Sequence, residues 1–216
     1  MKPPRPWIII ALFVAVFVAA LFTDVPVSTW AHESGVAAWL KTHVHIAQTI
    51  RKPGNFFYTL FVCAVLLWTA YKSGARAGRQ LWEKPAIVLL AGVFSGVNAF
   101  LKWSIGRIRP YHGVPPFELH PFGRSPLDAE AGFSFPSGDA SLAFAMAVSL
   151  SIVAPRWWVL WWSLAIIVGL ERIAENAHYP SDVVAGAALG TLVAILAKKI
   201  VQAWGKPVTT TPSGDI

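Results

Sequence analysis

Long apolar runs separated by short polar segments dominate the pattern of the 216-residue chain. A bilayer core about 30 Å thick is crossed by roughly 20 residues of helix. Six runs approach that length if the shorter ones extend into the membrane interface. They are Trp7 to about Val25, about Phe56 to Tyr71, Pro85 to about Ile105, Ser137 to Ala154, Trp157 to about Leu170, and Asp182 to Ile200. The pattern predicts an all-α, polytopic membrane protein with six transmembrane helices in one bundle over residues 1–204, followed by a disordered cytoplasmic tail at 205–216.

Basic residues are distributed unevenly around these runs. The N-terminus, residues 72–84, the turn at 155–156 and the C-terminal end from Lys198 onward together hold ten of the 18 Lys and Arg residues. The positive-inside rule assigns these segments to the cytoplasm. We therefore expect a plasma (inner) membrane protein with both termini cytoplasmic. Lys2 and Arg5 also suit a signal peptide, but no small-x-small cleavage site follows, so we expect a retained first helix.

Two long connections then lie on the outer side of the membrane. The first contains "VAAWLKTHVHIAQTI", residues 36–50, which we interpret as one interfacial helix anchored by Trp39. The second, Arg107–Pro136, is rich in Pro and Gly.

Composition supports the membrane class over an ordinary soluble domain. Hydrophobic residues make up 55% of the chain and charged residues 13%. A net charge of +7 raises the question of nucleic-acid binding. We expect no such partner, because the charges flank apolar runs and form no patch. The single cysteine, Cys63, excludes an intramolecular disulfide.

Ionisable residues collect at three membrane boundaries, where they are costly and therefore need a reason. The third run ends in "LKWSIGRIRP", the fourth begins at "PSGD", and the link between the fifth and sixth is "ERIAENAHYPSD". The predicted topology puts all three segments at the same outer boundary, although the spans were assigned without reference to them. We therefore predict one shared site at the outer membrane–water boundary.

The cations and the helix start in these segments suit an anion. Lys102, Arg109 and Arg172 offer charged donors, and arginine can hold phosphate oxygens in a bidentate fork. Lys102 and Arg109 are seven residues apart and share a face for as long as the helix persists. Ser137 and Gly138 begin a helix, whose free N–H groups and dipole favour negative charge. Each cation alone would be read as a snorkelling interface residue, but together they predict a phosphate site.

The same segments contain a candidate nucleophile. His178 can act as a nucleophile or a base, and Asp182 can hold its ring in one tautomer. A lone histidine would more often be a packing residue. A zinc site from His112, Glu118 and His120 is a weaker alternative, because the spacing fits no strong ligand pattern.

The three segments resemble the type-2 phosphatidic acid phosphatase superfamily, which shares its site with vanadium haloperoxidases. The family pattern is Lys-x6-Arg-Pro, then Pro-Ser-Gly-His, then Ser-Arg-x5-His-x3-Asp. The resemblance implies that His178 attacks phosphorus to form a phosphohistidine, oriented by Asp182. It implies no metal or other cofactor. It also implies that the phosphate is held by Lys102, Arg109, Ser137, Gly138 and Arg172.

Two positions depart from that pattern. Glu171 replaces a serine, with little effect if it faces away, or with an ion pair to Arg172 if it does not. Asp139 replaces a histidine thought to protonate the leaving group. Asp139 can be the general acid itself. It can be tolerated because the substrate's leaving group needs little protonation, which favours a polyprenyl diphosphate as the substrate. It can also be a helix cap in a slow or inactive protein.

We therefore expect a membrane lipid phosphatase that acts on a lipid phosphate or diphosphate in the bilayer and releases inorganic phosphate. Undecaprenyl diphosphate is the leading substrate. Phosphatidylglycerol phosphate, phosphatidic acid and lipid A phosphate are alternatives, as is a lipid phosphotransferase. A non-catalytic lipid-phosphate binder or transporter is the alternative from another class. The sequence does not specify an oligomeric state.

Overall fold

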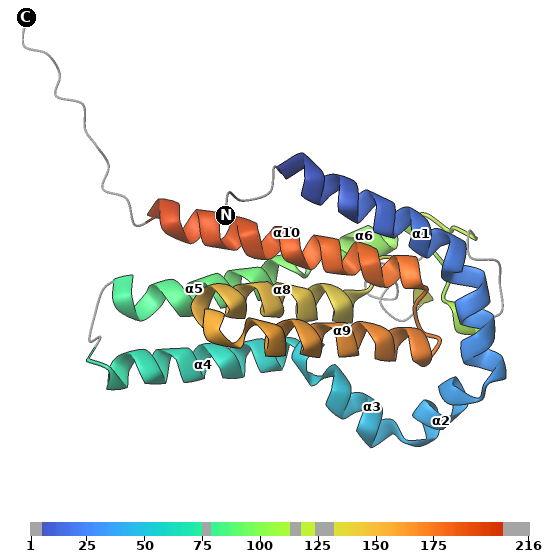
Figure 1. Cartoon of the computed structure of the whole chain (residues 1–216), viewed down its shortest axis with the longest axis horizontal. Helices are drawn as coiled ribbons and strands as arrows, with labels where there is room; N and C mark the ends of the chain where they lie inside the picture. Colours follow the sequence, from blue (N-terminus) through green and yellow to red (C-terminus); the bar gives the residue numbers. More distant parts are fainter. Residues whose placement is uncertain (1–5, 75–78, 113–117, 124–131, 205–216) are drawn as a thin grey trace, which may run out of the picture.

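The computed structural model describes residues 6–74, 79–112, 118–123 and 132–204 (Figure 1). The predicted disordered tail at 205–216 lies outside these residues. Apolar sequence of helical length gives an antiparallel bundle of long helices, with two short helices at one end. The helices are α1 (Pro6–Glu33), α2 (Val36–Thr42), α3 (Val44–Arg51), α4 (Phe56–Lys72), α5 (Arg79–Phe94), α6 (Val97–Ile105), α8 (Gly138–Val153), α9 (Trp158–Ala174) and α10 (Pro180–Trp204).

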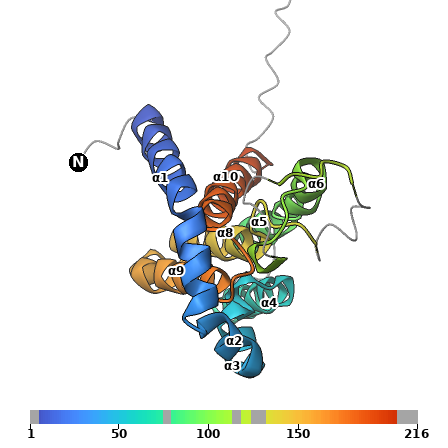
Figure 2. The same cartoon turned by 90° about the vertical axis from the view of Figure 1, so that its right-hand side faces the viewer.

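Helix α8 forms the centre of the bundle. It packs against α10, α9 and α5, as the end-on view shows (Figure 2). Gly186 and Gly190 of α10 allow this close approach. A Cβ at Gly186 would collide with the Ser137 carbonyl oxygen, and a Cβ at Gly190 with that of Ser141. The N-terminus of α8 is therefore fixed against α10.

The apolar runs agree with the helices, although not every one is long enough to span a membrane. Four helical segments are long and apolar enough: Ile10–Glu33, Leu81–Ile105, Pro155–Ala174 and Pro180–Trp204. Val44–Gly54 and Phe56–Lys72 count as a fifth only if they form one span bent by 54°. Helix α8 is shorter. The protein is thus an all-helical membrane protein with four or five candidate spans, and the count of six stays a prediction.

The outer faces of these helices are apolar. Large side chains such as Ile10, Phe22, Phe57 and Leu192 are more than half exposed. Exposed apolar surface on this scale is suited to contact with lipid.

Several helices differ in detail from the expected runs. Helix α1 does not end near Val25 but continues through Pro26 to Glu33. The third run is one candidate span, Leu81–Ile105, but it is divided into two helices by a break at Ser95–Gly96. The proposed interfacial helix is likewise two helices, because the backbone leaves helical geometry at His43, whose ring Nδ1 lies 2.9 Å from the Trp39 carbonyl oxygen.

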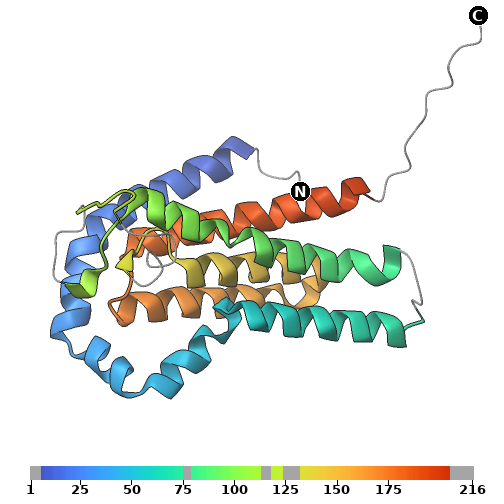
Figure 3. The same cartoon turned by 180° about the vertical axis from the view of Figure 1, so that it is seen from behind.

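Helices α2 and α3 lie at the same end of the bundle as the turn between α9 and α10, as the reverse view also shows (Figure 3). This is the end at which α8 begins. The three charged segments are therefore gathered at one end of the molecule, together with α3, which sequence had not connected with them.

Candidate active site

The three charged segments surround one cavity of about 490 Å³. It lies where the end of α6, the start of α8 and the turn after α9 meet. Six of the eight predicted site residues line it: Lys102, Arg109, Gly138, Asp139, Arg172 and His178. The other two, Ser137 and Asp182, are fully buried beside it. The sequence prediction of one shared site is consistent with this arrangement.

Lys102 and Arg109 reach the cavity by different routes. Lys102 lies in the last turn of α6 and is 2% exposed. The helix then ends at Ile105 because Gly106 adopts a left-handed conformation (φ 68°), so Arg109 is not on a continued helix face as expected. Arg109 Nη1 donates to the Ala177 carbonyl oxygen at 3.3 Å and lies 3.4 Å from His178 Nε2. The two cations therefore converge through a turn in the chain.

The start of α8 presents backbone to the cavity. Ser137 caps the helix, and its side-chain oxygen accepts from the Ala140 N–H at 3.4 Å. The Ser137 N–H donates to the Asp182 carbonyl oxygen at 3.0 Å. A Cβ at Gly138 would lie 3.7 Å from Lys102 Nζ, so the ammonium faces the first residue of the helix. Positive charge and a helix N-terminus thus occur together, as an anion site requires.

His178 lies in the turn between α9 and α10 and is 3% exposed. Burial lowers the pKa of His178 well below its usual 6.5, and the nearby charges of Arg109, Lys102 and Arg172 lower it further, against a smaller opposing effect of the Ser134 backbone. A guanidinium can only donate, so its contact with Nε2 requires a lone pair on that nitrogen. The imidazole is therefore neutral, with the lone pair of Nε2 on the cationic side.

Asp182 is close to His178 but is held by other groups. The distance from His178 Nδ1 to Asp182 Oδ2 is 3.7 Å, longer than a hydrogen bond. The Tyr179 N–H donates to Oδ2 at 2.8 Å, and Arg107 Nη1 donates to Oδ1 at 2.6 Å. Asp182 thus supplies negative charge behind the ring, while its own position is set by Tyr179 and Arg107.

Sequence reasoning missed the network that fixes Asp182. Arg107 Nη2 donates to Asp24 Oδ2 at 2.7 Å, and Asp24 also accepts from the Ser181 N–H and hydroxyl at 2.9 and 2.6 Å. Arg107 also lies over the Tyr179 ring, at 4.2 Å from its centroid. Burial raises the pKa of Tyr179 to about 12, with Arg107 opposing that rise. The signal available in the sequence was the carboxylate of Asp24 near the end of an apolar run.

Arg172 lies among three carboxylates. It is in the last turn of α9, since that helix continues past the expected end at Leu170 to Ala174. Its Nη1 lies 2.8 Å from Glu175 Oε2 and 3.5 Å from Glu171 Oε2, and its Nε lies 3.3 Å from Asp139 Oδ2. Glu171 is buried and does not face away, so the alternative of an ion pair with Arg172 is confirmed.

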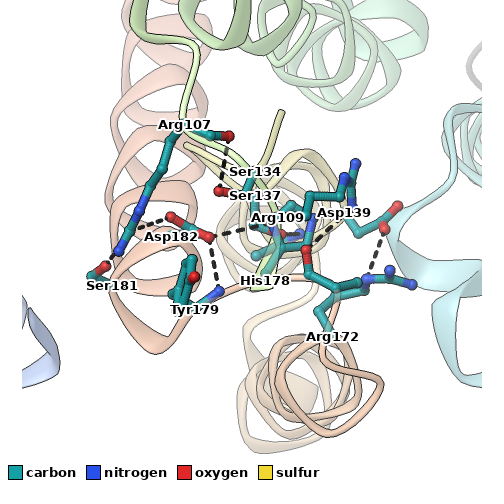
Figure 4. A network of polar contacts seen from close by, with 12 residues as sticks. Arg107, Arg109, Ser134, Ser137, Asp139, Arg172, His178, Tyr179, Ser181 and Asp182 are labelled. Atoms are coloured by element: carbon teal, nitrogen blue, oxygen red, sulfur yellow. Dashed lines mark hydrogen bonds and ion pairs between the residues drawn. The ribbon is translucent and has the colours of Figure 1, made fainter. Parts of the chain in front are cut away.

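Arg51 of α3 joins this group, which sequence did not suggest. Its Nε lies 3.3 Å from Glu171 Oε1, and its Nη2 lies 3.2 Å from Glu175 Oε1. Figure 4 shows Asp139 beside Arg172 on one side of His178, and Arg107 with Asp182 on the other.

The zinc alternative finds no support in the described parts of the chain. No three His, Cys, Asp or Glu side chains gather there as a metal site. Glu118 Oε1 lies 3.0 Å from His120 Nε2, and both side chains are exposed. The His112 ring instead lies against Tyr111, with ring centroids 4.5 Å apart.

The fold and site define the class of an all-helical membrane phosphatase with a histidine in a cationic cavity. The PAP2 superfamily model matches residues 81–206, and the chain belongs to that superfamily. A lipid A 1-phosphatase of Rhizobium johnstonii is 31% identical over 98% of this chain and 88% of that protein. An undecaprenyl-diphosphatase of Sulfolobus acidocaldarius is 30% identical over 70% of this chain and 67% of that protein.

The fold has a solved counterpart. A PAP2-type phosphatidylglycerolphosphate phosphatase from Bacillus subtilis matches 91% of this chain and 98% of its own, with a TM-score of 0.55 and 23% identity. Family and relatives together make this protein a membrane lipid phosphatase. The resemblance found in the sequence is thereby confirmed.

Proposed function

We propose that the protein removes a phosphate from a lipid by nucleophilic catalysis at His178. The observation that carries the proposal is the buried, neutral His178 with Nε2 beside Arg109 in a cavity that Lys102 and Arg172 also line. Nε2 attacks phosphorus, an N–P bond forms, and the P–O bond to the lipid breaks with its electron pair on the departing oxygen. Water then attacks the phosphohistidine and releases inorganic phosphate.

The cations and the start of α8 stabilise the transition state. Lys102, Arg109 and the N–H of Gly138 hold the oxygens on which charge develops. The Ser137 N–H is already donated to the Asp182 carbonyl oxygen, so Ser137 acts by capping and fixing the start of α8. Arg172 completes this set in the proposal. Its three carboxylate neighbours keep the guanidinium in place between turnovers, and the phosphate competes with them. Asp182 offsets the positive charge that the histidine ring acquires.

Asp139 constrains the substrate. Its carboxyl oxygen lies 3.3 Å from Arg172 Nε, a distance that suits an ion pair between a carboxylate and the guanidinium. A carboxylate in that state has no proton to give to the leaving oxygen. We therefore assign substrates whose leaving group departs without strong acid help. A phosphate anhydride meets this condition best, because it releases a phosphate. A phosphate on the anomeric carbon of a sugar meets it in part, because its hemiacetal oxygen is a better leaving group than the glycerol oxygen of phosphatidic acid.

Two substrates have a better leaving group than phosphatidic acid and agree with relatives. Undecaprenyl diphosphate is the anhydride, and a relative named as an undecaprenyl-diphosphatase matches about two thirds of the chain. Lipid A 1-phosphate carries the anomeric phosphate, and a relative with that activity matches almost the whole chain. A phosphotransferase would share the first half of the reaction and differ only in the acceptor.

We also assign one domain over residues 1–204 with six spans, both termini in the cytoplasm of a plasma (inner) membrane, and the cavity at the outer boundary. The asymmetric basic residues and the position of all three motifs at one end of the bundle support this arrangement.

A panel of lipids tests the proposal. Phosphate release from undecaprenyl diphosphate, lipid A 1-phosphate, phosphatidic acid and phosphatidylglycerol phosphate is measured in detergent without added metal. The first two are expected to be the better substrates, and acid-labile phosphate is expected on His178 after rapid quenching. Release that depends on an added lipid acceptor would instead indicate a phosphotransferase. Binding without any phosphohistidine would contradict the proposed chemistry.

A further inference from the structure

A second cavity, of about 410 Å³, lies beside the catalytic one. It is lined by Gln48, Arg51, Lys52, Asn55 and Asp139, and two of these, Arg51 and Asp139, line the catalytic cavity as well. Its volume is within the usual range for small-molecule sites. The two cavities are therefore neighbours that meet at one arginine and one aspartate.

Because Asp139 lines both cavities, its position indicates which part of a substrate lies in the second cavity. Given the proposed attack by His178, the leaving group departs on the side away from Nε2. Asp139 occupies the position at which the family pattern has its leaving-group histidine. The second cavity thus extends the leaving-group side of the site. This step rests on the proposed function, because it assumes that His178 attacks the phosphate.

All five lining side chains are polar, and they include both donors and acceptors. Asn55 Oδ1 caps α4 by accepting from the Phe57 N–H at 2.9 Å, while the NH₂ of the same amide is a donor. Lys52 and Gln48 are exposed and contact no other side chain by hydrogen bond or ion pair in the part of the chain that the structure describes. The diacylglycerol of phosphatidic acid would place apolar surface against these groups.

The charges around the cavity decide between a second phosphate and a neutral polar group. Three cations, Arg51, Lys52 and Arg172, stand against three carboxylates, Asp139, Glu171 and Glu175. Arg51 lies 3.3 and 3.2 Å from two of those carboxylates and Arg172 contacts all three, so both guanidinium charges are already compensated and the exposed Lys52 is left as the cation for a ligand. A second phosphate would meet the Asp139 carboxylate with little net attraction. Hydroxyl groups can use the donors and the acceptors together.

We infer that this second cavity binds the sugar of a glycolipid phosphate while its anomeric phosphate lies at His178. Residues 48–55, which form most of the cavity, precede the family match at 81–206. Most of the catalytic cavity comes from the matched segment, although Arg51, Gly54 and Phe56 also line it, whereas the sugar subsite is supplied almost wholly by the chain before that segment. Gln48 and Lys52 are the specificity-determining residues.

Single variants test the subsite. Gln48→Ala and Lys52→Ala are each expected to raise KM for lipid A 1-phosphate by about threefold to tenfold, as the loss of one hydrogen bond predicts, with kcat nearly unchanged. KM for phosphatidic acid should not change. Gln202→Ala and Lys199→Ala, exposed positions on the far end of α10, are matched controls. Asn55 is left intact because its side chain also caps α4.

The outcomes are separable. Equal effects of Gln48→Ala and Lys52→Ala on all substrates, or none on the glycolipid, would overturn the sugar subsite. So would a rise in KM for undecaprenyl diphosphate with the glycolipid unaffected, since the cavity would then hold the second phosphate. If the wild type lacks turnover of lipid A 1-phosphate, the inference also fails. Failure of the proposed function appears differently, as turnover that survives His178→Ala.

Discussion

Asp139→Asn distinguishes an acid catalyst from an ion-pair partner. The substitution preserves shape, removes the charge and removes the capacity to carry a transferable proton. The Asp139 side chain is 37% exposed and lies 3.3 Å from Arg172 Nε. Arg172 keeps its contacts with Glu175 and Glu171, so its position should change little.

The two roles of Asp139 predict losses of kcat that differ by at least an order of magnitude. Loss of a general acid typically costs about 10²–10⁴-fold in rate. Loss of an ion pair exposed to this extent is worth only about 0–1 kcal/mol after solvent screening, or at most about fivefold. We therefore expect Asp139→Asn to lower kcat for undecaprenyl diphosphate by less than about tenfold.

The assay is inorganic phosphate release by purified protein in detergent, with undecaprenyl diphosphate and phosphatidic acid as parallel substrates. Glu171→Gln is the matched control, since it neutralises another carboxylate beside the same Arg172. An Asp139→Asn variant as inactive as His178→Ala on the diphosphate would show that Asp139 donates the proton. A clear wild-type preference for phosphatidic acid would refute the leaving-group argument.

Three further predictions concern His178 and the network behind it. His178→Ala should abolish both phosphate release and phosphohistidine trapping, and residual trapping would place the nucleophile elsewhere. Burial and neighbouring cations hold the pKa of His178 well below 6.5, so its imidazole stays neutral as the pH falls through that value. We therefore expect protonation of His178 to lower kcat/KM only at more acidic pH. An inflection of kcat/KM at pH 6.5 or above that is due to His178 would contradict this. Asp24→Asn weakens the buried ion pair with Arg107 and should lower the free energy of unfolding by about 3–5 kcal/mol, more than Ser181→Ala does. Thermal unfolding in detergent measures both variants. A larger loss of stability for Ser181→Ala would contradict the prediction.

The helices and most of the site were predictable from sequence because both are encoded locally. A membrane span requires a long apolar run, and each family motif fits within about a dozen residues. Contacts between distant segments were not predictable in this way. Asp24 meets Arg107 and Arg51 meets Glu171 only because α1 and α3 fold over one end of the bundle.

Local changes in backbone conformation explain why some helix boundaries differ from the apolar runs. Neither the break at His43 nor the left-handed Gly106 interrupts the hydrophobic pattern, so periodicity alone does not reveal them. The consequence for the site is that Arg109 approaches His178 from a turn. The spacing of seven residues from Lys102 was therefore informative for the family pattern but misleading about the helix.

The two departures from the family pattern meet at one side chain. Asp139 and Glu171 are 32 positions apart, yet their carboxylates lie 3.3 and 3.5 Å from the Arg172 guanidinium. Asp139→His would supply a proton donor, and Glu171→Ser would leave Arg172 with fewer competitors for phosphate. Neither change alone provides both functions.

We therefore expect the two substitutions to be coupled rather than independent. Groups in one ion-pair network usually show interaction energies of about 0.5–3 kcal/mol in a double-mutant cycle. The Asp139→His, Glu171→Ser double variant should raise kcat/KM for phosphatidic acid, relative to undecaprenyl diphosphate, by more than the product of the single effects. The ratio of the two substrates cancels differences in folded fraction between variants. Additive effects on that ratio, within about 0.5 kcal/mol, would mean that Asp139 and Glu171 act separately and that Arg172 does not link them.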